Sequence, residues 1–184
     1  MCGSDGVEHT SAAAARATGA RVVNCGVCGR CSNEHDTGIY HARAQEHTGA
    51  LARCAVLRLL LGEAAAKWCL TERIGHTAEC ARCFADNMGC TIAHCYAECV
   101  LGMATPLTAS SANSAERSHF NGTIYALNAC FLCDELYCSP TFVGRCAGAN
   151  RRTAGVVTDI SRPDAAVCSA AREEYGGSGV DRIV

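Results

Sequence analysis

The chain carries 16 cysteines among 184 residues, and three pairs of them have the spacing Cys-x2-Cys: Cys25/Cys28, Cys80/Cys83 and Cys130/Cys133. This spacing is compatible with several chemistries. Dithiol oxidoreductases use one such pair, structural zinc sites use two, and iron–sulfur proteins use a longer cysteine run. In an oxidising compartment the same residues form a disulfide framework.

The redox and iron–sulfur interpretations both meet a missing feature. Cys25-Gly-Val-Cys28 has dithiol spacing, but no βαβ pattern surrounds it and a third cysteine, Cys31, follows. Cys25, Cys28 and Cys31 match the first three ligands of an iron–sulfur run, but the adjacent fourth cysteine followed by proline is absent. Structural disulfides are the better interpretation of this segment.

Zinc is the main rival of the disulfide interpretation. His35 or His94 could complete a tetrahedral set with one of the Cys-x2-Cys pairs. A zinc site would leave few cysteines over, however, and this chain has many whose spacing fits no zinc ribbon. The sequence therefore favours disulfides and keeps zinc as an alternative.

No residue pattern indicates catalysis. A Cys–His nucleophilic pair would need a free thiolate among oxidised neighbours, and no local signature supports one. We interpret His41, His47 and His76 as surface residues. The sequence thus predicts a protein that is not an enzyme and needs no cofactor.

Asp134 and Glu135 are adjacent carboxylates, which could do acid–base work. The simpler interpretation is that they are helix charges paired with Arg145, Arg151 or Arg152. The arginine pair could also bind a carboxylate or phosphate of a partner.

Composition supports the disulfide framework. The 49% hydrophobic content includes 32 alanines and 16 cysteines, and Leu, Ile, Val and Phe together give only 33 residues. A disulfide contributes about 2–4 kcal/mol, so bridges can offset a thin core. The predicted disulfide residues are all 16 cysteines: Cys2, Cys25, Cys28, Cys31, Cys54, Cys69, Cys80, Cys83, Cys90, Cys95, Cys99, Cys130, Cys133, Cys138, Cys146 and Cys168. The sequence leaves their pairing open.

Charge and hydropathy exclude several classes of partner. The net charge is −2, which gives no signal for nucleic acid or membrane-surface binding. The most apolar stretch, residues 55–70, is interrupted by Arg58, Glu63 and Lys67, so no membrane-spanning helix is expected. Because disulfides require an oxidising compartment, we expect a targeting segment that was removed or lies outside this sequence.

Residues 39–73 have helical periodicity. A predicted apolar face consists of Leu57, Leu61, Ala65 and Trp68. Gly49 is a candidate break within this segment, and Gly75 is a candidate C-cap.

Residues 77–101 are predicted to form a helical hairpin. Thr77 is a candidate N-cap for a helix that ends at Met88, and a second helix follows from Thr91 to Leu101, with the turn at Gly89. Cysteines three or four residues apart share one helix face. We therefore expect a disulfide from Cys80 or Cys83 to Cys95 or Cys99.

The rest of the chain is predicted to be helical with irregular loops. The expected elements are an exposed loop over 102–120, a glycosylation sequon at Asn121, and helices over 123–137, 139–147 and 163–175. Period-2 alternation is nearly absent, so the predicted class is all-α, a small disulfide-rich helical domain with irregular loops. The domain organisation is an arm (1–24), a cysteine-rich helical domain (25–170) and a tail (171–184).

Three motifs carry a resemblance over about residues 25–162. They are Cys25-Gly-x-Cys28-Gly-x-Cys31-Ser-Asn-x-His35-Asp36, Gly75-His-Thr77-x2-Cys80-x2-Cys83, and a run from Cys130-x2-Cys133-Asp-Glu-x2-Cys138 to Arg162. Together they resemble a family of small cysteine-rich proteins of algae with complex plastids, such as diatoms and dinoflagellates.

The resemblance implies a non-catalytic structural or assembly subunit of a larger complex. It implies a lumenal accessory subunit of an algal photosystem supercomplex, with protein subunits of a membrane complex as partners and the thylakoid lumen of the plastid as its location. The loop, arm and tail are the expected contact surfaces. The alternatives are a secreted cysteine-rich binding domain, glycosylated at Asn121, or a zinc-binding or dithiol redox protein.

Overall fold

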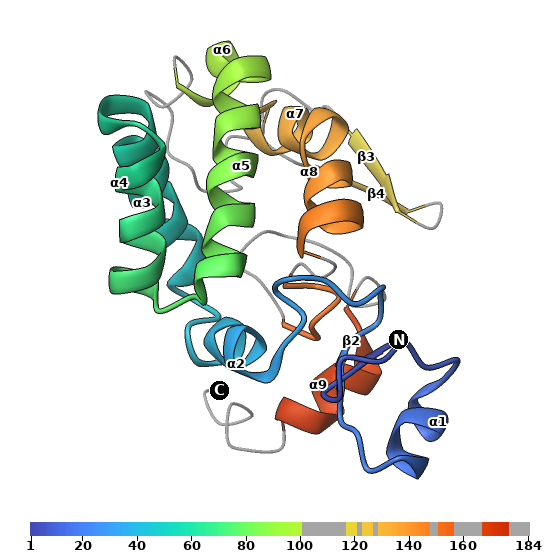
Figure 1. Ribbon diagram of the computed structural model, residues 1–184. Coiled ribbons are helices and arrows are strands. Elements are labelled where there is room, and N and C mark those ends of the chain that lie inside the picture. The colour runs from blue at the N-terminus through green and yellow to red at the C-terminus, as the bar shows by residue number, and fades with distance from the viewer. Residues whose placement is uncertain (101–116, 121–122, 127–128, 148–150, 157–166, 177–184) are drawn as a thin grey trace.

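The computed structural model describes residues 1–100, 117–120, 123–126, 129–147, 151–156 and 167–176 (Figure 1). Helices dominate these residues, and the few strands are short. The all-α, disulfide-rich class that the sequence predicts is confirmed.

The first and last described segments pack together at one end of the molecule (Figure 1). Strand β1 (Cys2–Gly3) pairs antiparallel with β2 (Val22–Asn24), and helix α1 (Ala12–Ala17) lies between them in sequence. Helix α9 (Ser169–Gly176) packs against β2 and against α2 (Glu34–Ala42). Because β1 and β2 are buried, the predicted arm is packed into the protein along part of its length.

The main core lies among α2, α3 (His47–Leu61), α4 (Glu63–Trp68), the π-helix η1 (Cys69–Ile74) and α5 (Ala78–His94). The chain turns between α3 and α4 at Gly62, whose φ is +87°. The predicted break at Gly49 is wrong, since Gly49 lies inside α3. The predicted apolar face is also wrong in part, because Leu61 and Trp68 are exposed. The predicted C-cap is confirmed, because Gly75 ends η1 with φ +98°.

Helix α5 is continuous, so the predicted hairpin over 77–101 is wrong. Thr77 caps the helix as predicted, because its Oγ1 accepts a hydrogen bond from the Cys80 N–H at 3.3 Å. Gly89 does not form a turn. A Cβ there would lie 2.9 Å from Arg58 Nη2, so the glycine gives room to the guanidinium of α3. A short helix α6 (Tyr96–Cys99) follows α5.

The C-terminal part begins with a hairpin of β3 (Arg117–Phe120) and β4 (Thr123–Ala126). Helix α7 (Ala129–Tyr137), α8 (Ser139–Thr141) and the π-helix η3 (Phe142–Ala147) follow. The helix predicted over 123–137 is therefore wrong at its start, where Thr, Ile and Tyr favour a strand. The predicted 102–120 loop is wrong at its end, because residues 117–120 form β3. Asn121 and residues 102–116 lie outside the described residues, as do 163–166 of the last predicted helix.

All 16 cysteines are paired. The bridges are Cys2–Cys28, Cys25–Cys168, Cys31–Cys80, Cys54–Cys69, Cys83–Cys146, Cys90–Cys138, Cys95–Cys133 and Cys99–Cys130. The predicted pairing of Cys80 or Cys83 with Cys95 or Cys99 is wrong. Because α5 is straight, these sulfurs face other parts of the chain. Among the described residues, no helix combines the length and apolar character that crossing a bilayer would need.

Candidate functional site

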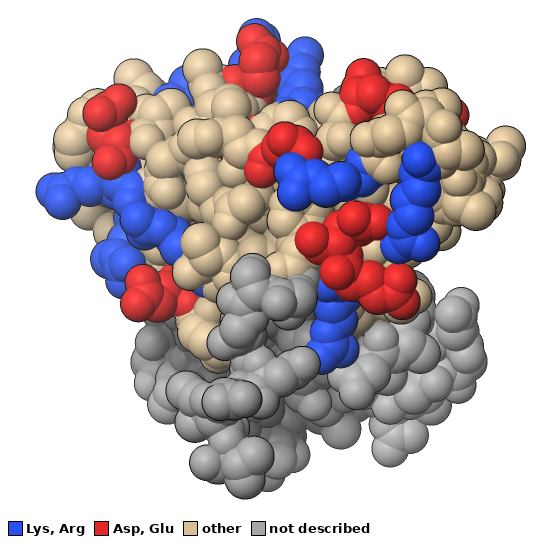
Figure 2. Space-filling view, turned by 90° about the horizontal axis from the view of Figure 1, so that it is seen from below, with Lys and Arg blue, Asp and Glu red and all other residues tan. Residues whose placement is uncertain are grey.

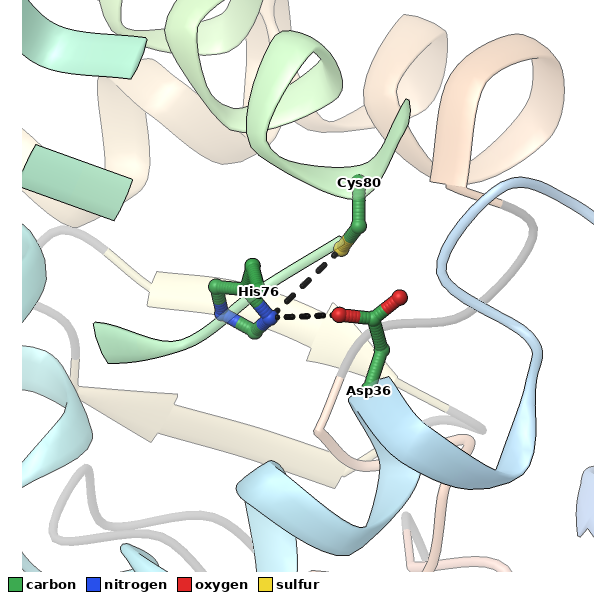
Figure 3. A group of neighbouring side chains, drawn as sticks. All are labelled: Asp36, His76 and Cys80. Atoms are coloured by element: carbon green, nitrogen blue, oxygen red, sulfur yellow. Dashed lines mark hydrogen bonds and ion pairs between the residues drawn. The ribbon is translucent and has the colours of Figure 1, made fainter. Parts of the chain in front are cut away.

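A buried chain of three side chains runs through the core. Asp36 lies in the first turn of α2, His76 follows the Gly75 turn, and His47 is the first residue of α3. His76 Nδ1 lies 2.9 Å from Asp36 Oδ1 (Figure 3), and His76 Nε2 lies 3.0 Å from His47 Nε2. All three residues are buried. Two consecutive helices, α2 and α3, and a turn that lies far along the chain from both thus bring an Asp–His–His chain together.

Asp36 is held by hydrogen bonds from three residues. Its carboxylate accepts from Asn33 Nδ2 at 2.7 Å, from the Thr77 N–H at 3.0 Å and from Thr77 Oγ1 at 2.6 Å, besides His76. Burial alone would raise the pKa of Asp36. The hydrogen bonds from His76, Thr77 and Asn33 outweigh burial and lower this pKa below its ordinary value. Asp36 is therefore a carboxylate at neutral pH.

Aromatic rings enclose the two imidazoles. Tyr40 meets His47 and His76 edge-on, with centroid distances of 5.3 and 5.6 Å, and Phe84 stacks on His76 at 5.0 Å. Burial lowers the pKa of His47 to about 2, and the positive charge of Arg151 and Arg43 acts in the same direction. His47 is therefore uncharged at neutral pH.

His47 lies in the wall of a cavity of about 300 Å³. The cavity is bounded by α3, α5, α7 and η3, and its lining is mainly apolar, with Leu51, Ala55, Met88, Ile92 and Val143. Pockets of this kind, apolar with a few placed polar groups, are typical ligand sites.

The polar side chains in the cavity wall are bonded to protein, with one exception. Asp134 accepts from Thr91 Oγ1 at 2.6 Å and from Ser139 Oγ at 2.8 Å. Arg152 pairs with Glu135 at 3.2 Å, and Arg151 donates to Thr48 Oγ1 at 2.6 Å. The exception is His47 Nδ1, which has no hydrogen-bond partner among the described residues. His47 is fully buried, so this atom is not exposed at the cavity surface.

A model for a family of unknown function, DUF8771, matches residues 63–170. The chain belongs to this family. No significant match is found among curated proteins or among solved structures. The DUF8771 match covers the α5, α7 and η3 walls of the cavity and His76, whereas Asp36 and His47 lie before it.

A second grouping in this DUF8771 protein has the residue types of a metal site. Ligand atoms of Asp36, His76 and Cys80 lie within 4.8 Å of one another (Figure 3). Cys80 Sγ is already bonded to Cys31, however, and His76 Nδ1 is hydrogen-bonded to Asp36. A metal would require a free thiolate and the loss of that hydrogen bond. In the oxidised protein the three residues form a hydrogen-bonded cluster.

The cysteines and histidines proposed for zinc do not converge. Cys25 and Cys28 are bonded to different partners, at opposite ends of the chain. His35 Nε2 is hydrogen-bonded to the Gly75 carbonyl at 2.7 Å, and the exposed His94 stacks on Tyr137. The zinc and dithiol interpretations therefore have no support from the positions of these residues.

The prediction that His41, His47 and His76 are surface residues is wrong. His47 and His76 are buried, and His41 is half-buried, with Nε2 2.9 Å from the Ala154 carbonyl. The partners that bury them lie tens of residues away, so local sequence could not show this. The predicted ion pairing of Glu135 is confirmed for Arg152, whereas Asp134 serves as a hydrogen-bond acceptor in the cavity wall.

The surface of the protein offers two further features. Acidic and basic side chains are interspersed over the described part of the face shown in Figure 2. Beside the α3–α4 turn, the apolar side chains of Leu60 and Leu61 are 70% and 69% exposed, and Trp68 at the end of α4 is 51% exposed. We call Leu60 and Leu61 the α3–α4 apolar patch.

Proposed function

We propose that this protein is a non-catalytic binding protein that holds a small apolar molecule in the cavity between α3, α5 and α7. The observation that carries the proposal is the cavity itself, about 300 Å³ in volume and lined mainly by apolar side chains. Concave apolar pockets with a few placed polar groups are typical ligand sites.

Disulfides support the proposal because they hold the cavity walls in place. Cys90–Cys138 joins α5 to the residue that follows α7, and Cys95–Cys133 joins the C-cap of α5 to α7. Cys99–Cys130 joins α6 to α7. A preformed cavity avoids the cost of ordering its walls when a ligand binds. The sulfurs are all oxidised, which leaves no thiolate nucleophile, and the strongly lowered pKa of His47 makes its imidazole a poor general base. Both observations favour binding over catalysis.

Calorimetric titration of the oxidised protein with the bicyclic hydrocarbon tetralin tests the proposal. We expect saturable binding to the wild type, and loss of binding in Ala55→Phe, which fills the cavity from α3. The matched control is Ala93→Phe on the exposed face of α5, which should bind like the wild type. Absence of binding to the wild type, or equal binding to Ala55→Phe, would contradict the proposal.

The α3–α4 apolar patch favours a second candidate function, a structural or assembly subunit of a larger complex. Contiguous apolar patches on a protein surface mark sites of contact with other molecules. The sequence resemblance leads us to propose the thylakoid lumen as its location and an algal photosystem supercomplex as its partner. Native protein should co-purify with pigment–protein complexes, and Leu60→Asp with Leu61→Asp should abolish this. A glycan at Asn121 would favour secretion instead.

A further inference from the structure

We infer that the residues around the Cys31–Cys80 bridge form a zinc site when this bridge is reduced. The four ligands are the side chains of Asp36, His76, Cys80 and Cys31. The disulfide and the zinc ion are alternative states of one site, and the redox conditions select between them. The inference is independent of the cavity and of the proposed binding function.

The ligand atoms of three of these residues already lie together. His76 Nδ1 lies 2.9 Å from Asp36 Oδ1 and 3.8 Å from Cys80 Sγ, and the three ligand atoms lie within 4.8 Å of one another (Figure 3). No other three potential metal ligands come as close together in the part of the chain that the structure describes. The disulfide brings Cys31 Sγ to the same place, so reduction supplies a fourth ligand.

The spacing of these atoms suits a tetrahedral zinc ion. With zinc bonds of about 2.3 Å to sulfur and about 2.0 Å to nitrogen or oxygen, neighbouring ligand atoms lie about 3.3–3.8 Å apart. The distance between His76 Nδ1 and Cys80 Sγ is in this range, and the contact between His76 and Asp36 needs to lengthen by only about 0.4 Å. The larger movement is that of Cys31 Sγ away from Cys80 Sγ. Cys31 lies in the loop before α2, so this movement does not require α5 to shift.

Two helix N-termini favour the charged forms of the ligands. Asp36 lies in the first turn of α2, three residues after the N-cap Asn33, and Cys80 lies in the first turn of α5, three residues after the N-cap Thr77. The positive end of a helix dipole stabilises a carboxylate and a thiolate. Zinc needs its carboxylate and thiol ligands in the deprotonated form. The backbone at both positions therefore favours the forms that bind metal.

An outer shell of hydrogen bonds already orients two of the ligands. The Asp36 carboxylate accepts from Asn33 Nδ2 and from Thr77 Oγ1, and His76 Nε2 lies 3.0 Å from His47 Nε2. In metal sites, ligating carboxylates are held by such hydrogen bonds, and a ligating imidazole donates its other N–H to a neighbouring group. In the zinc form His76 coordinates through Nδ1 and donates from Nε2 to His47. The protein therefore holds the first two ligands in place before a metal arrives.

Reduction of the bridge is a thiol–disulfide exchange. A dithiol reductant supplies two electrons and two protons, the bond between Cys31 and Cys80 breaks to give two thiols, and the reductant becomes a disulfide. Zinc then binds both sulfurs, and the two thiol protons go to solvent. His76 Nδ1 gives up the proton that it donates to Asp36, which goes to solvent, or to Nε2 where that nitrogen carries none. Because zinc binds only the reduced site, it favours reduction of this bridge.

A redox titration of the wild-type protein at several buffered concentrations of free zinc tests the inference. Differential alkylation followed by mass spectrometry measures the reduced fraction of each bridge. Once free zinc exceeds its Kd, each tenfold increase should favour the reduced Cys31–Cys80 pair tenfold, which raises its midpoint potential by about 30 mV. The control is Cys54–Cys69, which is also buried and belongs to no ligand group among the described residues. An unchanged potential of Cys31–Cys80, or an equal shift of both bridges, would overturn the inference.

Asp36→Asn tests the carboxylate ligand in the same titration. The substitution keeps the size of the side chain and removes its charge, so at least about tenfold more zinc should be needed for the same shift in potential. The matched control is Asp86→Asn, which changes an exposed carboxylate of α5 and should respond like the wild type. A wild-type response of Asp36→Asn would show that Asp36 is not a ligand and would overturn the four-residue site.

Cys31→Ser gives a readout that needs no reductant. It leaves Cys80 as a thiol beside His76 and Asp36 while the other seven bridges stay closed. This variant should bind one Co²⁺ and show the visible absorption of a tetrahedral cobalt–thiolate complex. The control Cys69→Ser frees the buried thiol of Cys54, which should give no such absorption. Equal absorption in both variants, or none in a folded Cys31→Ser protein, would contradict the inference, and the wild-type titration decides if Cys31→Ser does not fold.

Discussion

At the scale of single residues, the burial of His47 makes the stability of the protein depend on pH. The protein buries an imidazole with one unsatisfied nitrogen where a leucine or phenylalanine would fill the space without that cost. The same burial makes His47 a source of acid sensitivity.

We expect the free energy of unfolding to fall as the pH drops below about 6.5. In that range the unfolded chain binds a proton at His47, whereas the folded protein binds none there until about pH 2. The unfolded state then holds more protons, so stability decreases with falling pH, by up to about 1.4 kcal/mol per pH unit for one such group. Burial also lowers the pKa of His41, which adds in the same direction. Calorimetric melting between pH 6.5 and 4.5 measures the slope.

The matched pair for this prediction is His47→Gln and His94→Gln. In His47→Gln, the dependence of stability on pH should become weaker, and the part due to His41 should remain. His94→Gln removes an exposed imidazole, and this variant should keep the wild-type dependence on pH. The range stops at pH 4.5 because the unfolded chain begins to bind a proton at Asp36 below that pH. The pKa of Asp36 is lowered in the folded protein, so its contribution to stability is lost only in that more acidic range. A melting temperature that does not change over this range would refute the prediction.

At the scale of elements, Gly155 fixes the contact between the 151–155 turn and α9. It has φ +83°, and a Cβ there would lie 2.4 Å from Arg172 N and 2.9 Å from Ala171 C. We expect Gly155→Ala to destabilise the protein by more than about 1 kcal/mol, because both the backbone conformation and the close approach of α9 are incompatible with a Cβ.

Gly144→Ala is the control for this substitution. Gly144 lies in η3, and a Cβ there would meet nothing within 4 Å. This change should leave stability unchanged or raise it by about 0.4–1 kcal/mol, since it restricts the unfolded chain. Melting temperatures of the two variants compare the effects. Equal effects would show that the 151–155 turn tolerates displacement from α9.

The sequence predicted those features of the elements that depend on local chemistry. The helical class and the caps at Gly75 and Thr77 were correct, because a cap is decided by residues within one turn. Glycines inside helices are not distinguished from turn glycines by the sequence. The predicted turn at Gly89 is wrong, and the presence of glycine there is explained by the guanidinium of Arg58, which reaches this position from α3. The sequence also does not predict β4. Its pairing partner is β3, and β3 shows no alternation of apolar and polar residues.

The candidate site could not be predicted because its members are far apart in sequence. Asp36 and His76 are separated by 40 residues, and His47 and His76 by 29. Each residue alone resembles a surface position, and burial arises only when α2, α3 and the Gly75 turn pack together. The even cysteine count indicated bridges, but their partners depend on the same packing.

At the scale of the whole molecule, the bridges replace a large core, and their effects overlap. Cys25–Cys168 closes a loop of 143 residues and Cys54–Cys69 one of 15. If each acted alone, the longer loop would stabilise more. Cys31–Cys80 and Cys83–Cys146 already connect the two ends of the longer loop through a short path. The two bridges should therefore contribute similar amounts, about 3 kcal/mol each.

Removing each bridge by paired Cys→Ala substitutions tests this expectation. Both double variants should lose a similar amount of stability, and hydrogen exchange should locate the effects differently. Loss of Cys25–Cys168 should increase exchange in α9 and β2, whereas loss of Cys54–Cys69 should increase it in α3 and η1. A much larger loss for the Cys25–Cys168 variant, or increased exchange throughout α5, would show that this bridge holds the whole fold.

Two of these bridges, Cys2–Cys28 and Cys25–Cys168, overlap in sequence. Every peptide bond between Cys2 and Cys168 therefore lies inside at least one covalent ring. A protease that cuts once anywhere in that span adds a water molecule and releases no fragment. On a non-reducing gel the nicked protein should migrate as one band, and it should separate into two pieces only after reduction. The protein can thus be cut in a protease-rich compartment and remain one molecule, with the walls of its cavity still joined.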